Sequence, residues 1–206
     1  MVSTLPDLTD RYDAAAPMWG DKMRALGYFD AYLGFLAHRP DVPAKGTRVV
    51  DIGAGTAAFT EAWAAIHGTA HEITLVDPSQ RMLDRAALQL AKNGVEADCI
   101  TSDLASLTSD KTFDVALAAH VIEHGDPISM LDQMHRLVRP NGQLWLVVSK
   151  PHWCNAIVWL QWRHKSYKPA QIRTLLESTG WQLVSEYAFP AGPPSRTSRG
   201  YICRRA

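Results

Sequence analysis

Short apolar, β-branched runs alternate with longer amphipathic stretches from Thr47 onward, and this alternation restricts the fold more than any other feature of the sequence. The runs predict strands at Arg48–Ile52, Glu72–Val76, Ala97–Thr101, Phe113–Ala119 and Gln143–Ser149. The stretches between them predict helices over Thr56–Ile66, Pro78–Lys92 and Pro127–Val138. Strands that alternate with helices in this way build a parallel sheet that is covered on both faces.

The pattern changes after the fifth predicted strand. Lys168–Thr179 predicts a helix that Gly180 ends, and two further strands follow at Trp181–Ala188 and Arg199–Arg204. The turn-rich residues Pro190–Ser198 between them suit a hairpin, and a hairpin joins antiparallel strands. We therefore expect an α/β fold: a single Rossmann-like, doubly wound domain with a seven-stranded, mostly parallel sheet whose last strand is antiparallel.

Two segments lie outside this core. Leu8–Arg39 is helix-like and rich in aromatic residues, so we expect residues 1–46 to form a helical N-terminal cover on a core of residues 47–206. Residues 151–167 form an insertion after the fifth strand. A length of 206 residues fits one domain with such additions.

The composition excludes several classes of protein. The chain has 21 Lys and Arg and 21 Asp and Glu, so a uniformly basic protein that coats nucleic acid is excluded. No apolar run approaches the roughly 18 residues that cross a bilayer, and the first residues do not resemble a signal peptide. Cys99, Cys154 and Cys203 form no C-x-x-C pair. These features predict a cytoplasmic protein without a membrane span.

The neutral total hides an uneven distribution of charge. Residues 161–206 hold eight Lys and Arg against two Asp and Glu, a net charge of +6, which leaves −6 for residues 1–160. We interpret the basic part as a solvated face. An acidic acceptor, a phospholipid headgroup or an RNA end that binds there is the alternative.

A glycine turn follows the first strand and identifies the candidate ligand site. Gly53 and Gly55 stand between the strand and the next helix, where the missing side chains let a ligand approach the backbone. Asp77 ends the second strand, where a carboxylate can accept hydrogen bonds from both hydroxyls of an adenosine ribose. A dinucleotide site would have a third glycine at Ala58, so a nicotinamide oxidoreductase is the weaker interpretation. A simple tight turn, with Asp77 as a helix cap, is the structural alternative.

The stretch Asp51-x-Gly53-x-Gly55-x-Ala57 resembles motif I of the class I S-adenosylmethionine-dependent methyltransferases, in particular their small-molecule type. The similarity continues through four later segments and covers roughly residues 48–149: Val76–Leu83, Thr101–Leu104, Phe113–His124 and Arg139–Gly142. Two positions depart from the family pattern, because Ala57 and Asn141 stand where the family has glycines.

The resemblance implies S-adenosylmethionine as cofactor, S-adenosylhomocysteine as product, and a small-molecule acceptor that is methylated on oxygen or nitrogen. It places Asp51, Gly53, Ala54 and Gly55 around the methionine part of the cofactor. It places Asp77 and Pro78 at the ribose, and Met82, Asp103 and Leu104 at the adenine. Ala119, at the end of the fourth strand, and Tyr12, in an N-terminal segment that covers the cofactor, complete the implied site.

Two histidines after the fourth strand are the candidate catalytic residues. If the segment is helical, His120, Glu123 and His124 share one face, and His120 is the base or the group that orients the acceptor. The ubiquinone-pathway O-methyltransferases and the small-RNA 2′-O-methyltransferases resemble this segment and have Glu-x-x-Glu-His as metal ligands there. A metal-assisted O-methyltransferase, with His152 as a fourth ligand, is therefore one alternative, although His120 in place of the first Glu suits a softer ion than Mg²⁺.

The insertion of residues 151–167 commonly walls the acceptor pocket in the family. Its tryptophans, Trp153, Trp159 and Trp162, could contact an apolar, aromatic or cationic acceptor. A binding module that holds the cofactor without catalysis is the alternative from outside the enzymes. The sequence does not define the oligomeric state or the acceptor.

Overall fold

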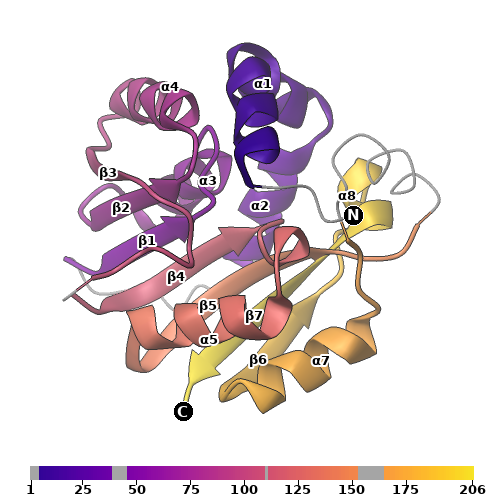
Figure 1. Cartoon of the computed structure of the whole chain (residues 1–206). Helices are drawn as coiled ribbons and strands as arrows, with labels where there is room; N and C mark the ends of the chain where they lie inside the picture. The colour runs from indigo at the N-terminus through magenta and orange to yellow at the C-terminus, as the bar shows by residue number, and fades with distance from the viewer. Residues whose placement is uncertain (1–4, 39–45, 110, 153–164) are drawn as a thin grey trace.

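The computed structural model describes residues 5–38, 46–109, 111–152 and 165–206. They form a seven-stranded sheet in the order β3-β2-β1-β4-β5-β7-β6 (Figure 1). The strands are β1 (Arg48–Ile52), β2 (Glu72–Asp77), β3 (Ala97–Thr101), β4 (Phe113–Ala119), β5 (Val138–Ser149), β6 (Trp181–Tyr187) and β7 (Ser198–Arg205). Neighbours among β1 to β5 pair in parallel, whereas β7 is antiparallel to both β5 and β6. The predicted fold class is confirmed.

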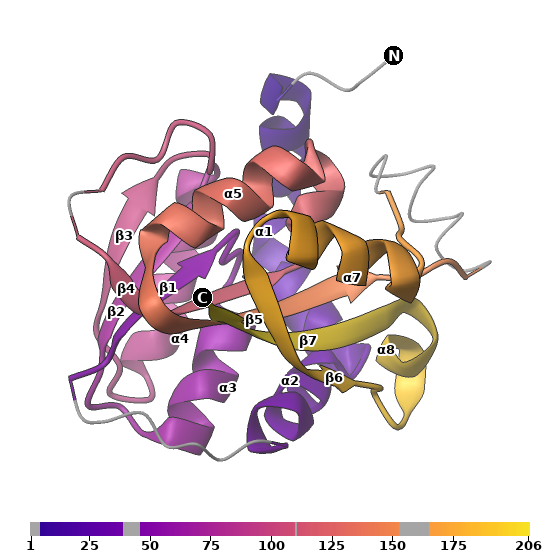
Figure 2. The ribbon, with the colours of Figure 1, turned by 90° about the horizontal axis from the view of Figure 1, so that it is seen from below.

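Helices cover both faces of the sheet. One face carries α1 (Leu5–Ala25), α2 (Tyr28–Ala37), α3 (Ala58–His67) and α4 (Gln80–Ala91), and the other carries α5 (Pro127–Leu137) and α7 (Pro169–Ser178), as Figures 1 and 2 show. A separate apolar cluster lies under each layer, around Phe35 and Trp63 on the first face and around Leu131 and Leu176 on the second. None of the helices in the described part of the chain has the length and apolar character of a membrane-spanning segment.

The N-terminal cover consists of two helices, where the sequence indicated one helix-like stretch. The break is at Gly27, which has a left-handed backbone (φ 79°) and precedes the first residue of α2. Glycine adopts this conformation without the steric cost that a Cβ brings. The turn lets α2 pack on α3 through ring contacts of Tyr32 and Phe35 with Phe59.

Two predicted boundaries in the second half of the chain were wrong. β5 begins at Val138, not at Gln143, because Arg139–Gly142 continues the strand as an irregular stretch in which Asn141 has a left-handed backbone (φ 62°). The connection between β6 and β7 contains a short helix, α8 (Gly192–Thr197), whose first turn contains Pro193 and Pro194. Proline suits the first turn of a helix, where its missing N–H is not needed. The antiparallel pairing of these strands is as predicted.

The reversed direction of β7 decides which residues meet at the edge of the sheet. The carboxyl ends of β1, β2, β4 and β5 lie at one edge, as in all parallel sheets of this kind. Because β7 is antiparallel to β5 and Ser149 is paired with Ser198, the start of β7 lies at the same edge. Five strands therefore bring the residues Gly53, Asp77, His120, Ser149 and Ser198 to one side of the molecule.

Candidate functional site

A cavity of about 390 Å³ lies at this edge of the sheet. Its volume is within the range of small-molecule pockets, about 300–1,000 Å³. Ten of the residues predicted to hold the cofactor line it: Tyr12, Asp51, Gly53, Ala54, Gly55, Asp77, Pro78, Asp103, Leu104 and Ala119. His120 and His124 line it as well, and α1 adds Trp19 and Met23. The structure thus gathers most of the predicted site around one space.

The glycine turn forms part of the cavity wall. The backbone N–H groups of Gly53 and Ala54 both donate to the carbonyl oxygen of Val76, at 2.8 and 3.1 Å, which ties the end of β1 to the end of β2. A Cβ on Gly53 would lie 2.7 Å from Val121 Cγ2, and the φ of Gly53 is +66°, so this position requires glycine. Ala57 is also left-handed (φ 63°), which explains why the family pattern has a glycine there.

Asp77 fixes the turn through both of its carboxylate oxygens. Oδ2 accepts the Gly55 N–H at 2.9 Å, and Oδ1 accepts the Ser79 N–H at 2.9 Å. The cap of α4 is Ser79, whose hydroxyl accepts the Met82 N–H, so the interpretation of Asp77 as the cap of this helix was wrong. A carboxylate has about four acceptor sites, so two remain for a ligand. Burial raises the pKa of Asp77, and the two backbone bonds oppose this shift.

Asp51 is the most enclosed acid of the cavity wall. Its side chain accepts the Thr60 hydroxyl at 2.6 Å, and only 1% of the residue is exposed. Burial raises its pKa to about 7. Asp51 therefore changes its charge in the neutral pH range, where an ordinary aspartate stays ionised.

The residues predicted for the adenine side lie in different surroundings. Asp103 and Leu104 line the cavity, and Asp103 Oδ1 also accepts the Ser106 N–H at 2.7 Å. Met82 does not line the cavity, so the structure places it apart from the other residues predicted to hold the cofactor. It lies in the first turn of α4 and is completely buried, because that turn points its side chain into the protein.

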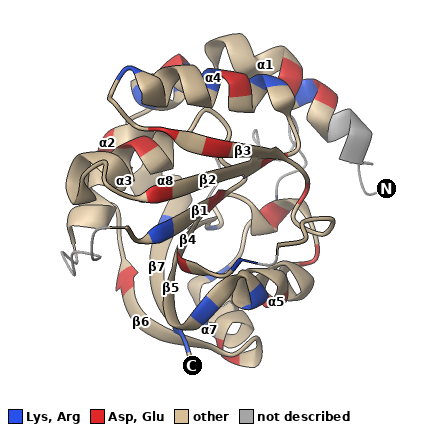
Figure 3. Ribbon diagram, turned by 90° about the vertical axis from the view of Figure 1, so that its left-hand side faces the viewer, with Lys and Arg blue, Asp and Glu red and all other residues tan. Residues whose placement is uncertain are grey.

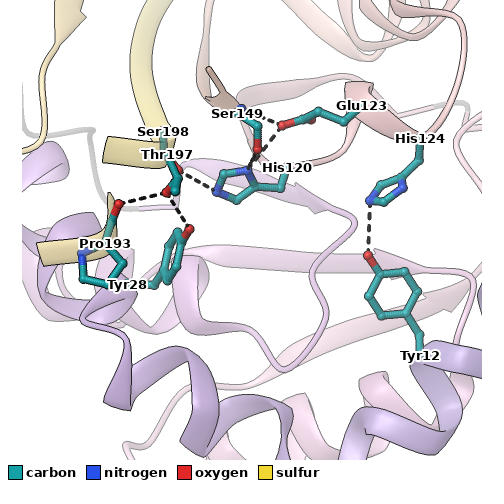
Figure 4. A network of polar contacts seen from close by, with 9 residues as sticks. All are labelled: Tyr12, Tyr28, His120, Glu123, His124, Ser149, Pro193, Thr197 and Ser198. Carbon is teal, nitrogen blue, oxygen red and sulfur yellow. Dashed lines mark hydrogen bonds and ion pairs between the residues drawn. The ribbon is translucent and has the colours of Figure 1, made fainter. Parts of the chain in front are cut away.

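Helix α1 reaches the cavity through Tyr12. The Tyr12 hydroxyl lies 3.1 Å from His124 Nε2 (Figure 4), and the Tyr12 ring makes an edge contact with Trp19, with the ring centroids 5.6 Å apart. Burial raises the pKa of the Tyr12 phenol, and the nearby Asp77 and Glu123 add to this, so the phenol stays protonated. The next residue, Asp13, accepts the Ser79 hydroxyl, which anchors α1 to the start of α4.

His120 is held at the end of β4 in a left-handed backbone conformation (φ 59°). Its N–H donates to the Val147 carbonyl at 2.8 Å. On the ring, Nδ1 lies 3.0 Å from Ser149 Oγ and 3.2 Å from Glu123 Oε1, and Nε2 lies 3.4 Å from Ser198 Oγ (Figure 4). A non-glycine residue with positive φ costs free energy, and such residues are concentrated at functional sites.

The predicted common helical face for His120, Glu123 and His124 was wrong. The short 3₁₀ helix η1 (Ile122–His124) excludes His120, whose left-handed backbone precedes it. His120 and Glu123 still meet, but the His124 ring turns to Tyr12 (Figure 4). Because the three side chains do not point to one place, they do not fit as ligands of a shared metal ion. The part of the chain that the structure describes holds no group of three His, Cys, Asp or Glu suited to one.

Three further residues contact His120 in the site, and two of them had no signal in the sequence. The Glu123 side chain is fully buried, and Oε1 accepts the Ser149 N–H at 2.7 Å. Glu123 could be found from the His-x-x-Glu-His string. Ser149 and Ser198 could not, because the pairing of β5 with β4 brings Ser149 to His120 and the insertion of β7 beside β5 brings Ser198 there.

The predicted acceptor wall lies mostly outside the described residues, which omit Trp153, Cys154, Trp159 and Trp162. Part of the basic C-terminal charge is neutralised, because Arg173 and Arg199 both pair with Glu186. Figure 3 shows acidic residues along β2 and β3 and basic residues on α5 and at the C-terminal end.

Comparisons with known proteins identify relatives of this arrangement. A family described as "Methyltransferase domain" matches residues 49–142, which run from β1 through the irregular part of β5. The ubiquinone biosynthesis O-methyltransferase of Azotobacter vinelandii is 34% identical over 102 residues, 48% of this chain. The chain spans only 43% of the length of that relative. The protein of the same description from Maricaulis maris is 28% identical over 91% of this chain and 84% of its own length.

Solved structures share the fold over the whole chain. The 1,6-didemethyltoxoflavin-N1-methyltransferase of Burkholderia thailandensis, with bound S-adenosylhomocysteine, covers 100% of this chain and 92% of its own with a TM-score of 0.76 at 15% identity. The magnesium protoporphyrin IX methyltransferase of Synechocystis, with bound S-adenosylmethionine, covers 100% of both chains with a TM-score of 0.70 at 19% identity. At such identities the likeness concerns the fold.

Proposed function

We propose that the chain is a class I S-adenosylmethionine-dependent methyltransferase that transfers a methyl group from this cofactor to an oxygen or nitrogen of a small-molecule acceptor. The observation that carries the proposal is the cavity at the carboxyl edge of the sheet. Its wall combines the turn at Gly53, the carboxylate of Asp77 and the imidazole of His120. The names of the ubiquinone-pathway and toxoflavin relatives support small acceptors.

The described residues fit the cofactor. Asp77 keeps acceptor capacity for the ribose hydroxyls, the Gly53–Gly55 turn leaves backbone open to a ligand, and the enclosed carboxylate of Asp51 suits the ammonium group of the methionine part. S-adenosylmethionine supplies a methyl group on a positively charged sulfur, which keeps the electron pair of the sulfur–carbon bond when the methyl leaves.

His120 is the base in this proposal. An acceptor hydroxyl or ammonium must lose a proton as it is methylated, and a positioned imidazole can take it. The Glu123 carboxylate accepts from Nδ1–H, which leaves Nε2 as the basic nitrogen. The rest of the rate enhancement comes from holding the acceptor close to and in line with the methyl group.

The other elements have supporting roles in the proposal. Residues 1–46 act as a cover, because Tyr12 and Trp19 of α1 close one side of the cavity. We assign the wall of the acceptor pocket to residues 151–167. We place the protein in the cytoplasm, where free thiols such as those of Cys99 and Cys203 are usual.

A combined binding and turnover experiment tests the function. We expect S-adenosylhomocysteine to raise the melting temperature, which NAD should not do, and labelled S-adenosylmethionine to methylate at least one member of a panel of phenols, catechols and amines. Binding without transfer to any acceptor would favour a cofactor-binding module. A melting temperature raised by NAD instead would contradict the assignment of the cavity to S-adenosylmethionine.

The charge of Asp51 makes cofactor binding depend on pH. In the free protein burial holds its pKa at about 7, and a bound ammonium group favours the ionised form. Binding below pH 7 therefore releases a proton, and we expect the affinity for S-adenosylhomocysteine to weaken by up to about tenfold for each pH unit below 7 and to level off above it. Calorimetry from pH 5.5 to 8 measures this slope. The same slope in Asp51→Asn would refute the assignment.

The contact between Tyr12 and His124 holds the cover over the cavity. We expect Tyr12→Phe and His124→Ala each to weaken S-adenosylhomocysteine binding severalfold, because either change releases the end of α1. The double variant should bind the ligand about as tightly as the single variant with the lower affinity, since the two substitutions remove the same hydrogen bond. Fully additive losses would show that the two side chains act independently.

A further inference from the structure

The charges in the wall of the cavity are of one sign. Four carboxylates line it, those of Asp51, Asp77, Asp103 and Asp126. None of the described residues that line it is Lys or Arg. Lys165 donates to the Gly125 carbonyl at 3.1 Å but does not line the cavity. A cleft with charges of one sign attracts ligands of the opposite sign, so this cavity favours cations.

Tyr32 of α2 presents a hydroxyl to the same cavity. The residue lines the cavity, and only 6% of it is exposed. The hydroxyl forms no hydrogen bond with another described residue, yet its oxygen is not sealed inside the protein as that of Tyr167 is. Since the rest of the residue is buried, the open side of this oxygen faces the cavity.

Tyr32 lies between the cofactor side and the acceptor side of the cavity. Burial raises the pKa of its phenol well above the usual value, and Tyr28, Asp51 and Glu123 add to this shift, so the phenol keeps its proton. Asp51 belongs to the cofactor side, whereas Glu123 contacts His120 on the acceptor side. A hydroxyl between two carboxylates directs its proton towards negative charge, which leaves the oxygen to accept a hydrogen bond from a ligand.

We propose that the acceptor is an amine, and that the Tyr32 oxygen accepts a hydrogen bond from its N–H group. This inference rests on the proposed function and selects nitrogen over oxygen within it. A phenolate or a carboxylate would enter a cavity that holds carboxylates and, in its described wall, no Lys or Arg. An amine brings an N–H donor for Tyr32 and, in its protonated form, a positive charge that the aspartates attract.

The charge balance of the transfer also favours an amine. An ammonium first loses one proton, which ends on water whichever group takes it up first. The lone pair of the neutral nitrogen then bonds to the methyl carbon, while the sulfur keeps the electron pair of the sulfur–carbon bond. The positive charge moves from sulfur to nitrogen and stays in the cavity, where the carboxylates stabilise it before and after the transfer.

Transfer from cofactor with a ¹³C-labelled methyl group tests the acceptor class. We expect the whole chain to convert amines such as benzylamine, tryptamine and dopamine to N-methyl products, which the ¹³C shift separates from O-methyl products. Dopamine is the sharpest probe, because it carries a catechol and an amine in one molecule. O-methylation of dopamine, or transfer to 3,4-dihydroxybenzoate in preference to the amines, would overturn the inference and leave the methyltransferase function standing. Transfer to no acceptor at all would instead refute the proposed function, and the inference with it.

Two matched variants test the part that Tyr32 plays. Tyr32→Phe removes only the hydroxyl and should raise the KM for the amine about tenfold, with the affinity for S-adenosylhomocysteine unchanged. Sinefungin, a cofactor analogue in which a carbon with an amino group replaces the methylated sulfur, should lose affinity by a similar factor, and this readout needs no turnover. Tyr28→Phe is the control, because its hydroxyl contacts Thr197 and does not line the cavity. An equal loss of affinity for S-adenosylhomocysteine and sinefungin, or no loss for either, would overturn the role of Tyr32.

Discussion

Replacing His120 by asparagine should lower kcat by about 10²- to 10⁴-fold, the range in which a positioned general base contributes. Asparagine has no basic nitrogen, but it tolerates the left-handed backbone that His120 adopts better than alanine does. The cofactor affinity should stay nearly unchanged, because the ribose and methionine parts are assigned to Asp77 and Asp51. Steady-state turnover and calorimetry with S-adenosylhomocysteine measure the two quantities on the same sample.

Two further variants distinguish a loss of catalysis from a loss of folding. His120→Ala should show the same kinetic defect together with a lower melting temperature, because alanine tolerates the left-handed backbone conformation less well than asparagine does. His38→Ala, an exposed histidine at the end of α2, is the matched control and should leave kcat unchanged. A His120→Asn variant that keeps full activity would remove His120 from the mechanism.

Replacing Asp77 by alanine should weaken S-adenosylhomocysteine binding by about 1–3 kcal/mol, or about 5- to 150-fold, the usual range for hydrogen bonds to a charged group. The variant loses the acceptors for the ribose hydroxyls. It also loses the acceptors of the Gly55 and Ser79 N–H groups, so the turn loosens where the ligand meets it. Both effects act in the same direction.

Asp114→Ala separates ligand binding from general stability. Asp114 also accepts a backbone N–H, that of Arg48 at 2.7 Å, and it ends no strand at the cavity. We expect this control to lower the melting temperature without changing the affinity. An Asp77→Ala variant with wild-type affinity would show that the carboxylate does not hold the ribose.

The parallel part of the fold could be predicted from the sequence because its signals are local. Val49, Val50 and Ile52 make β1 apolar on both faces, and β1, β3 and β4 begin and end where the pattern predicts. The irregular start of β5 could not be predicted, because Pro140, Asn141 and Gly142 also suit a turn. Only the pairing of β5 with β4 decides between a turn and a bulged strand.

The cofactor side of the site could likewise be predicted from local signals, whereas the acceptor side could not. The cofactor side follows from Asp51, Gly53, Gly55 and Asp77, which lie at strand ends that a parallel sheet must bring together. The acceptor side depends on one long-range event, the placement of β7 between β5 and β6, which brings Ser198 to His120. Neither the left-handed backbone of His120 nor the direction of the His124 ring has a signal in the sequence.

A crystal structure of the protein with bound S-adenosylhomocysteine would show whether the cavity is the cofactor site. We expect the ligand in the cavity at the carboxyl edge, with both ribose hydroxyls within hydrogen-bonding distance of the Asp77 carboxylate and the sulfur on the side of His120. A ligand bound elsewhere, or one whose ribose does not contact Asp77, would contradict it.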